Sequence, residues 1–241
     1  MAAKRVLIVH AHPEPRSFTA SMKAEAEKQF RALGYEVRVS DLYAQGFNPV
    51  ASAADFPDRE EDYLVYAKEQ RVAYANGTLP DDIRREVENV QWADLLVLNF
   101  PIFWFSVPAI LKGWFDRVFL SGPFYGGMRF YDRGGLRGKK AWMTTTLGGR
   151  PHMFGEDAVH GRIDLLLSHL LRATLGYVGY EVYEPFFGYH VPYITPEQRT
   201  EVMEEFKSAI VGLDDRATLA MPSLNSFDEL LYPKPAALAG A

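Results

Sequence analysis

The amino-acid sequence predicts an α/β fold in which a parallel sheet carries helices on both faces. Wholly apolar runs at residues 6–9 and 95–100 are typical of strands that are buried on both sides. Segments 18–33 and 196–213 repeat apolar residues at steps of three or four, which is the pattern of a helix with one buried face. Because the two kinds of segment alternate along the chain, we expect parallel strands joined by helical crossovers.

In the first part of the chain, capping residues set the limits of the helices. Ser17 is suited to cap the first helix, Gly34 is suited to end it, and Pro80 is suited to begin a later one. The expected elements are a strand at 6–9, a helix at 18–33, a strand at 37–40, a loop at 41–57 and helices at 58–76 and 80–91.

In the second part, proline and glycine mark the boundaries. Pro108 is suited to begin a helix, and the glycine-rich segment 121–138 predicts a long irregular excursion. The expected elements are a strand at 95–100, a loop at 101–107, a helix at 108–119, a strand at 140–146, a loop at 147–160, a helix at 161–176, a strand at 180–187, a helix at 196–213 and an irregular tail from residue 220.

Composition excludes several classes of protein. The 241 residues are 48% hydrophobic and 24% charged, which is typical of a globular chain, and the net charge of −5 argues against binding to nucleic-acid backbones. The absence of cysteine excludes disulfides and thiolate chemistry and suggests a reducing compartment, so we expect a cytoplasmic protein. Pro101 and Pro108 interrupt the longest apolar stretch, so we expect no membrane span.

The loop after the first strand is a candidate anion site, because ligands of parallel sheets bind at the carboxyl ends of the strands. The hydroxyls of Ser17 and Thr19, with the amides of a helix start, suit a phosphate; plain helix capping by Ser17 is the alternative. His10 and His12 are two residues apart and are expected to share a strand face. A metal site would need a third ligand, and none is nearby, so we expect no metal.

Three further features follow the third and fourth strands. The aromatic run 103–105 could stack against a flat heteroaromatic ligand, although core packing is the alternative. Gly148 and Gly149 would let the backbone approach a ligand closely, or they form an ordinary turn. His160 precedes a predicted helix, where it either transfers protons or caps that helix.

Missing motifs narrow the choice of ligand. The chain has no G-x-G-x-x-G, no G-x-x-x-x-G-K-[ST] and no G-x-S-x-G, which counts against a nicotinamide-binding Rossmann domain, a P-loop NTPase and an α/β-hydrolase. A hydroxyl-rich phosphate loop with aromatic and glycine walls fits a flavin better than a nucleoside triphosphate.

One long segment carries a family resemblance. Phe100-Pro101, Trp104-Phe105 and the run 107–119 (VPAILKGWFDRVF) resemble the NAD(P)H:quinone oxidoreductases, the DT-diaphorase-like flavoproteins of flavodoxin-like fold. The resemblance extends over about residues 6–199, and it is supported at Ala11-His12, Ser17-Phe18, 41–43, 47–49, Tyr131-Asp132, Gly148-Gly149 and His160-Gly161.

The resemblance implies an architecture and an assembly. It implies a three-layer α/β/α sandwich with a five-stranded parallel sheet in the order 2-1-3-4-5, formed by a flavin-binding domain at 1–219. An irregular tail at 220–241 would pack on this domain or on a partner subunit. It also implies a homodimer with FAD at two interfacial sites, FMN being the less expected flavin.

The resemblance also assigns residues. Phe154 falls where the family has a catalytic tyrosine, Gly127 falls where it has a substrate-wall tyrosine, and Asp116 falls where it has glutamate. The expected catalytic positions are His160, Phe154, Gly148 and Gly149. The expected cofactor-binding residues are His12, Ser17, Phe18, Thr19, Pro101, Ile102, Phe103, Trp104, Phe105, Thr146, Leu147, Gly148, Gly149, Arg199 and, from a partner subunit, Tyr66. The expected substrate-binding residues are Trp104, Phe105, Tyr125, Met153 and Tyr177, with Tyr125 and Tyr177 contributed across the interface.

The implied activity is two-electron, ping-pong hydride transfer from NAD(P)H through FAD to a quinone-like aromatic acceptor. Azo and nitroaromatic compounds suit the same slot, and the sequence does not distinguish NADH from NADPH. The alternative from another class is a flavin-binding redox sensor or ancillary subunit with little turnover. A one-electron carrier like flavodoxin is a third interpretation.

Overall fold

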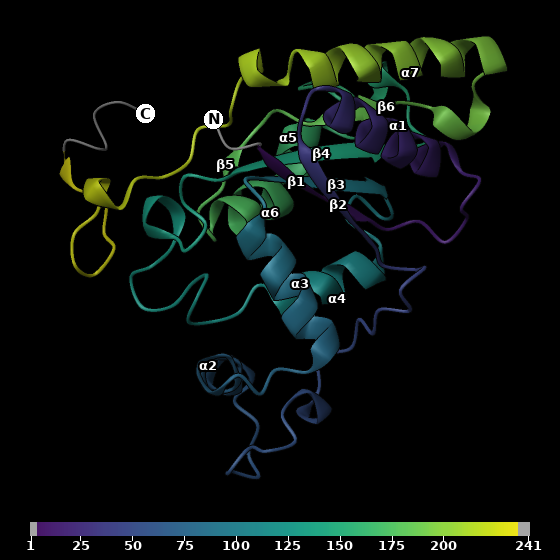
Figure 1. The fold of residues 1–241 in the computed structure, drawn as a ribbon. Coiled ribbons are helices and arrows are strands. Elements are labelled where there is room, and N and C mark those ends of the chain that lie inside the picture. The colour runs from purple at the N-terminus through teal and green to yellow at the C-terminus, as the bar shows by residue number, and fades with distance from the viewer. Residues whose placement is uncertain (1–3, 236–241) are drawn as a thin grey trace.

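A computed structural model describes residues 4–235, which form a parallel sheet between two layers of helices (Figure 1). The order of the elements is the alternation that the apolar runs and helical periodicities predict. The elements are β1 Arg5–His10, α1 Phe18–Ala32, β2 Glu36–Asp41, α2 Tyr66–Asn76, α3 Asp81–Trp92, β3 Leu95–Pro101, α4 Ala109–Val118, β4 Lys140–Thr146, α5 Ile163–Leu166, α6 Ser168–Leu170, β5 Glu181–Val182, β6 Phe186–Gly188 and α7 Pro196–Val211.

The strand order is β2-β1-β3-β4-β5, with β6 also paired to β4, and the predicted order 2-1-3-4-5 is confirmed. All pairings are parallel. The predicted strand at 180–187 is divided into β5 and β6, which both pair with β4 at the edge of the sheet; Pro185, which has no amide to give to a ladder, lies between them. The strands therefore end together at one edge of the sheet.

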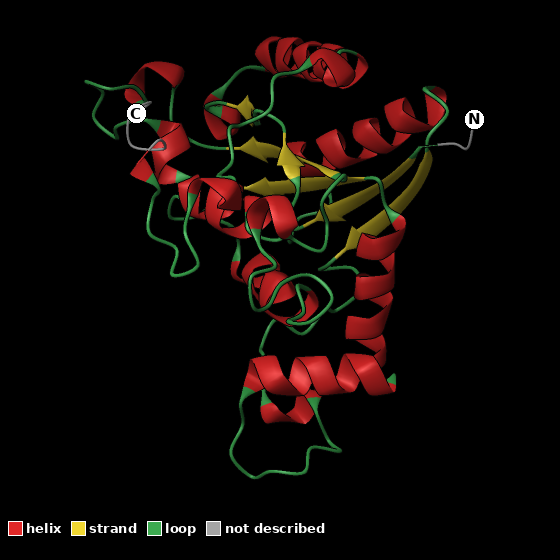
Figure 2. Ribbon diagram, turned by 90° about the vertical axis from the view of Figure 1, so that its left-hand side faces the viewer, coloured by secondary structure: helices red, strands yellow, loops and turns green. Residues whose placement is uncertain are grey.

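Each face of the sheet buries its own apolar cluster. Helices α1 and α7 cover one face, where Phe30 and Phe206 pack on Ile8 and Trp142. Helices α3 and α4 cover the other face, and Figure 2 shows the three layers edge-on. Alternation along each buried strand thus supplies both cores.

The first helix has the cap that the sequence predicts. The Ser17 hydroxyl accepts a hydrogen bond of 3.0 Å from the amide of Ala20. The predicted helix at 58–76 is wrong at its start, because α2 begins only at Tyr66. Residues 58–62 carry acidic side chains at helical spacing, which repel one another, and they offer no apolar face to bury.

The prediction of one regular helix at 161–176 is also wrong. It is broken into α5, α6 and a π-helical segment, Leu171–Gly176. The amide of Leu170 bonds to the carbonyl of Leu167, three residues back, and not to that of Leu166, so the regular i→i−4 ladder is interrupted there. The Thr174 hydroxyl then donates to the carbonyl of His169, at 2.8 Å.

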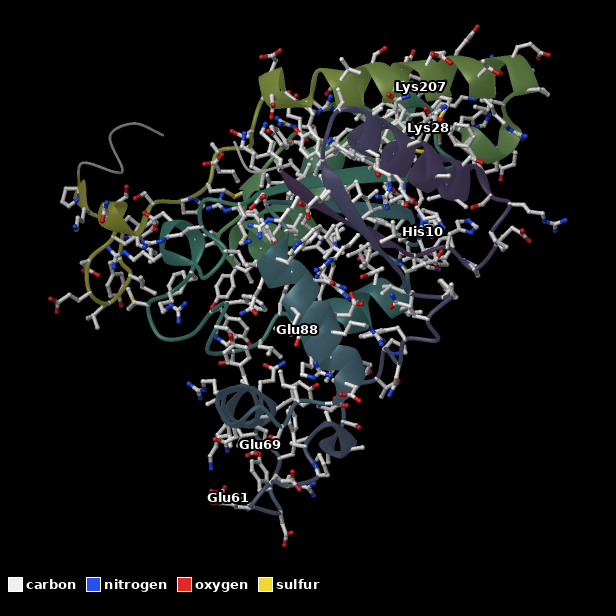
Figure 3. All side chains as sticks on the ribbon, in the orientation of Figure 1. His10, Lys28, Glu61, Glu69, Glu88 and Lys207 are labelled. Atoms are coloured by element: carbon white, nitrogen blue, oxygen red, sulfur yellow. The ribbon has the colours of Figure 1, made fainter. Side chains whose placement is uncertain are left out.

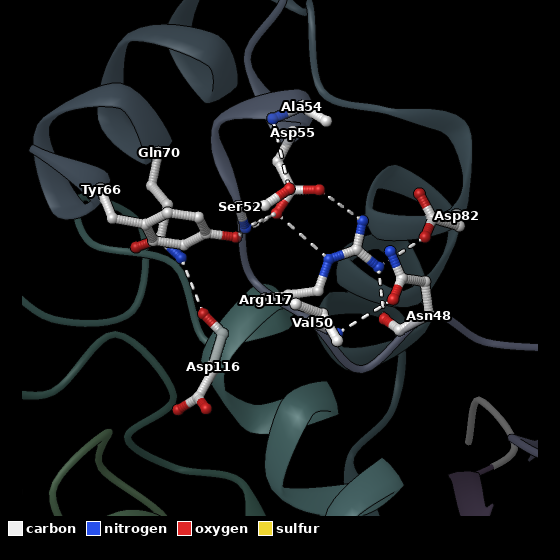
Figure 4. A network of polar contacts seen from close by, with 10 residues as sticks. All are labelled: Asn48, Val50, Ser52, Ala54, Asp55, Tyr66, Gln70, Asp82, Asp116 and Arg117. Atoms are coloured by element: carbon white, nitrogen blue, oxygen red, sulfur yellow. Dashed lines mark hydrogen bonds and ion pairs between the residues drawn. The ribbon is translucent and has the colours of Figure 1, made fainter. Parts of the chain in front are cut away.

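The segment between β2 and α2 is held by a buried arginine. Arg117 of α4 donates to Asp55, at 2.8 Å, and to Asp82, at 2.6 Å, while Tyr66 donates to Asp55 at 2.6 Å (Figure 4). Burial alone would raise the pKa of Asp55, but hydrogen bonds from Arg117 and Tyr66 hold it below its usual value. This network fixes a part of the chain that projects from the sheet and has little core of its own.

The tail folds back on the glycine-rich excursion. Ser223 donates to Asp132 at 2.6 Å, and the amide of Leu224 donates to the same carboxylate at 3.1 Å. Residues 236–241 of the predicted tail lie outside the described residues, and the domain boundary at 219 stays a prediction. None of the helices within residues 4–235 is long and apolar enough to cross a membrane.

Candidate active site

A cavity of about 400 Å³, which we call the α1 cavity, lies at the carboxyl ends of β1, β3 and β4. It gathers most of the cofactor-binding residues that the resemblance implies, including Arg199 from the distant helix α7. The lining residues are His12, Arg16, Ser17, Phe18, Thr19, Pro101, Ile102, Phe103, Thr146, Leu147, Gly148, Val191, Pro192 and Arg199.

Three of these lining residues were missed. Arg16 lies in the predicted phosphate loop, and a basic residue in such a loop could have been predicted to line the site. Val191 and Pro192 come from the irregular segment after β6, and nothing in their residue types indicates a ligand. Arg16 is paired with Glu14 at 2.9 Å, which orients its guanidinium at the mouth of the cavity.

Hydrogen-bond donors converge on the α1 cavity. The Nδ1 atom of His12 accepts from the amide of Glu14 at 2.9 Å, so the neutral ring carries its proton on Nε2. Burial lowers the pKa of His12, which favours this neutral donor form. Ser17 takes the amide of Ala20, whereas the helix itself leaves the amides of Phe18 and Thr19 unbonded. The end of the cavity beside α1 is therefore suited to an anion.

A buried row of polar side chains supports the floor of this cavity. His10, at the end of β1 (Figure 3), donates from Nδ1 to Asn99 at 2.7 Å, and Asn99 donates to Thr144 at 3.1 Å. The hydroxyls of Thr19 and Thr146 lie 2.8 Å apart and join α1 to β4. Because β1 ends at His10, His12 lies beyond the strand, and the expectation that the two histidines share a strand face is wrong.

A second cavity of about 350 Å³, the aromatic cavity, shares Ile102, Leu147 and Gly148 with the first. It brings the predicted Phe154 and His160 together, and it adds two residues from the broken helix that sequence reasoning missed. Its lining residues are Ile102, Trp104, Phe105, Leu147, Gly148, Gly149, Phe154, His160, Ile163 and Leu167. The shared wall makes the two cavities neighbours, and we call the pair the groove.

Trp104 and Phe105 reach this groove through an unusual turn. Both have positive φ, at 51° and 54°, and the flanking residues Phe103 and Ser106 exchange backbone hydrogen bonds of 3.0 and 2.9 Å. For residues other than glycine, such a conformation costs about 1–3 kcal/mol each. Conformations of this kind are found more often at functional sites. The turn presents Trp104 with 97% of its surface exposed. Core packing, the alternative for this aromatic run, is therefore wrong for Trp104.

Aromatic contacts surround His160. Its ring centroid lies 5.4 Å from that of Phe105 and 5.2 Å from that of Phe154. A Cβ atom at Gly149 would lie 2.7 Å from the Phe154 ring, so the glycine allows this ring to reach the groove. The imidazole brings two hydrogen-bonding nitrogens to this end of the groove.

The three predicted tyrosines lie elsewhere in the same chain. Tyr66, Tyr125 and Tyr177 line a third cavity of about 640 Å³, the tyrosine cavity, together with Lys112 and Asp116 of α4. It shares no lining residue with the groove, and Met153 lines none of these three cavities. The prediction that Tyr66, Tyr125 and Tyr177 act across a subunit interface stays a prediction.

Comparison with known proteins agrees with the architecture. A family model described as a flavodoxin-like fold matches residues 4–211. The chain is 37% identical over 229 residues to the NAD(P)H dehydrogenase (quinone) 1 of Cavia porcellus, covering 94% of this chain and 83% of that protein. It is 41% identical over 215 residues to the ribosyldihydronicotinamide dehydrogenase (quinone) of Mus musculus, covering 88% and 93%.

A solved structure is similar over nearly the whole length. The crystal structure of a Klebsiella pneumoniae protein named as a quinone reductase superposes with a TM-score of 0.93 at 30% identity, covering 99% of this chain and 97% of that one. The likeness extends through the long excursion and the tail as well as the sheet.

Proposed function

The chain belongs to the NAD(P)H:quinone oxidoreductases of flavodoxin-like fold and is an enzyme of the NAD(P)H dehydrogenase (quinone) type, and we propose that it uses FAD in a ping-pong reaction. In this proposal NAD(P)H and a quinone-like aromatic acceptor occupy the same slot in turn. Two electrons pass between them as a hydride equivalent.

The observation that carries the proposal is that the two cavities of the groove share a wall. Its α1 cavity offers neutral and backbone N–H donors, whereas its aromatic cavity offers flat apolar walls. A dinucleotide flavin has the same two chemical parts, a pyrophosphate and a planar ring. Fold and donor set therefore fit a flavin, with His12, Ser17, Phe18 and Thr19 at the phosphate end.

Each wall of the groove would have a separate task. Bound there, the isoalloxazine ring would supply two-electron chemistry, which side chains lack. Pro101 to Phe105 would hold one edge of it, and the backbone at Gly148 and Gly149 would approach the other edge closely. Arg199 would reach the adenosine side from α7.

His160 would manage the proton at the acceptor. It lies in the aromatic cavity between Phe105 and Phe154, and neither neighbour carries a hydroxyl. We propose that His160 exchanges a proton with the quinone oxygen directly or through one water. General acid–base catalysis of this kind contributes about 10²–10⁴-fold to a rate.

A homodimer would complete each site. Trp104 is almost fully exposed in one copy, and the tyrosine cavity presents Tyr125 and Tyr177 on another part of the surface. A second subunit placing these tyrosines over the groove would cover Trp104 and close the slot. Cytoplasmic location remains a prediction alongside this assembly.

The redox-sensor alternative also has an observation in its favour. Phe154 removes the hydroxyl that the family places beside its histidine, which would slow proton delivery during turnover. A sensor would bind flavin and change its redox state without sustained consumption of NAD(P)H.

Purification followed by a visible spectrum and identification of the released flavin tests the proposal. We expect a yellow protein that releases FAD, is bleached by NAD(P)H and is recoloured by a quinone. Release of FMN would overturn the cofactor assignment. Bleaching without sustained turnover would favour the sensor, and a colourless protein that takes up neither flavin would contradict the proposal.

A further inference from the structure

The aromatic cavity has two walls that come from separate parts of the chain. One wall is the strained turn that carries Trp104 and Phe105, and the other is the broken helix, which contributes Ile163 and Leu167. In the proposed function, the flavin ring and a flat acceptor stacked on it would share this cavity and lie between the two walls. The separation of the walls therefore limits how thick an acceptor can be and still share the cavity with the ring.

A hydrogen bond joins the two walls outside the cavity. The Oγ atom of Ser106, in the turn, lies 3.1 Å from Nε2 of His169, in the broken helix. The Nδ1 atom of His169 lies 3.1 Å from the carbonyl oxygen of Leu166, which can only accept. The neutral ring therefore carries its proton on Nδ1, and Nε2 accepts the proton of Ser106.

The break in the helix explains why His169 can do this. The turn from α5 into α6 bonds to the carbonyl of Leu167, so the preceding carbonyl, that of Leu166, is available to the imidazole. The Thr174 hydroxyl bonds to the backbone carbonyl of His169 itself. Thr174 thus holds the backbone of His169 and the carbonyl of Leu166 holds Nδ1 of the ring, so Nε2 is left to bond Ser106.

We propose that His169, through Ser106, sets the width of the acceptor slot and is a specificity-determining positioning residue for flat aromatic acceptors. The inference rests on the proposed function, because it takes the aromatic cavity as the acceptor slot. The turn needs such support, since two consecutive aromatic residues hold a sparsely populated backbone conformation there. Without the bond the turn relaxes, and the slot accepts thicker molecules.

The activity test compares a flat two-ring quinone, menadione, with a thick one, 2,6-di-tert-butyl-1,4-benzoquinone, in the flavin-loaded protein. In His169→Ala, we expect the ratio of kcat/KM for the thick acceptor to that for the flat one to rise about three- to tenfold, the effect of one lost hydrogen bond. Ser106→Ala should raise it equally, and the double variant no further, because both remove the same bond. His169→Gln keeps an acceptor and should retain the wild-type ratio.

A second readout does not depend on turnover. Hydrogen exchange at the amides of Phe103 and Ser106, which bond to each other's carbonyls, should quicken in His169→Ala and Ser106→Ala. Arg172→Ala, an exposed change on the same segment, serves as the matched control and should leave both readouts unchanged.

The outcomes separate this inference from the proposed function. Wild-type protein that binds no flavin or reduces no quinone would overturn the proposed function, and the acceptor inference with it. Normal wild-type turnover with an unchanged ratio in His169→Ala, or additive effects in the double variant, would overturn the inference alone.

Discussion

The ring centroids of Phe154 and His160 lie 5.2 Å apart, with the two planes inclined by 39°. A tyrosine in place of the phenylalanine would put a hydroxyl beside the imidazole in the same cavity. In the proposed function, this pair is therefore where proton delivery would differ from the pattern that the family resemblance implies.

Phe154→Tyr should increase the rate of flavin reduction by NAD(P)H and leave FAD binding intact. The added hydroxyl supplies a proton-transfer partner for His160, and such partners change rates by about 10²-fold or more. Stopped-flow absorbance measures the reduction rate, and the protein-bound flavin content measures binding. Phe154→Leu controls for loss of the ring, and identical reduction rates in wild type and Phe154→Tyr would contradict the relay account.

His12→Ala should weaken FAD binding about tenfold or more. His12 lines the α1 cavity and its neutral ring carries a proton on Nε2, and hydrogen bonds to charged groups contribute about 1.5–3 kcal/mol. Fluorescence titration of the flavin-free protein gives the Kd. His152→Ala, an exposed histidine outside the groove, is the control, and equal Kd values for the two variants would remove His12 from the phosphate site.

Gly113→Ala should destabilise the fold by several kcal/mol. A Cβ atom at this position of α4 would lie 2.0 Å from the backbone oxygen of Pro49, and a backbone atom cannot be displaced cheaply. Chemical denaturation measures the free energy of unfolding. Gly212→Ala, whose Cβ would meet its nearest neighbour at 3.5 Å, should change it far less. Equal stability of both variants would show that α4 does not pack so closely on this loop.

Asp55→Asn should cost about 3–5 kcal/mol near neutral pH, because it leaves the buried guanidinium of Arg117 with less compensation. The pKa of Asp55 is lower in the folded chain than its usual value. As the pH falls below about 4, the unfolded state therefore binds more protons, and the wild type loses this stability.

Denaturation curves between pH 7 and pH 3 measure this dependence. The difference between wild type and Asp55→Asn should shrink toward the acid end of that range. Because the variant has no carboxylate to protonate, a constant difference across the range would contradict the assignment to Asp55.

Local patterns predicted the sheet well, because each buried strand has a one-dimensional signature. β4 has the predicted bounds at Lys140 and Thr146. The delayed start of α2 and the break at Leu167 depend on charge repulsion and tertiary hydrogen bonds, which periodicity does not record. Pro185 is a sequence signal for the division of the last strand, but the apolar pattern of 180–187 hides it.

The sequence predicted the site residues that lie at or just after the ends of strands, and it missed those that come from irregular segments. Thr146 ends β4 and His12 comes just after β1, and the parallel topology brings them together. Val191 and Ile163 enter the groove from irregular segments, where no residue type indicates a ligand. The left-handed turn at Trp104 is contrary to residue preference, since glycine and asparagine dominate such turns.

In the proposed function, the α1 cavity also determines when during synthesis the protein can acquire its flavin. Its lining runs from His12, near the start of the chain, to Arg199 in the last helix. A ribosome-bound chain can pair β1 with β2 early, but it cannot form the complete cavity until α7 has emerged. FAD would therefore bind the finished fold and not its precursors, and by mass action would stabilise only chains that have folded to the end.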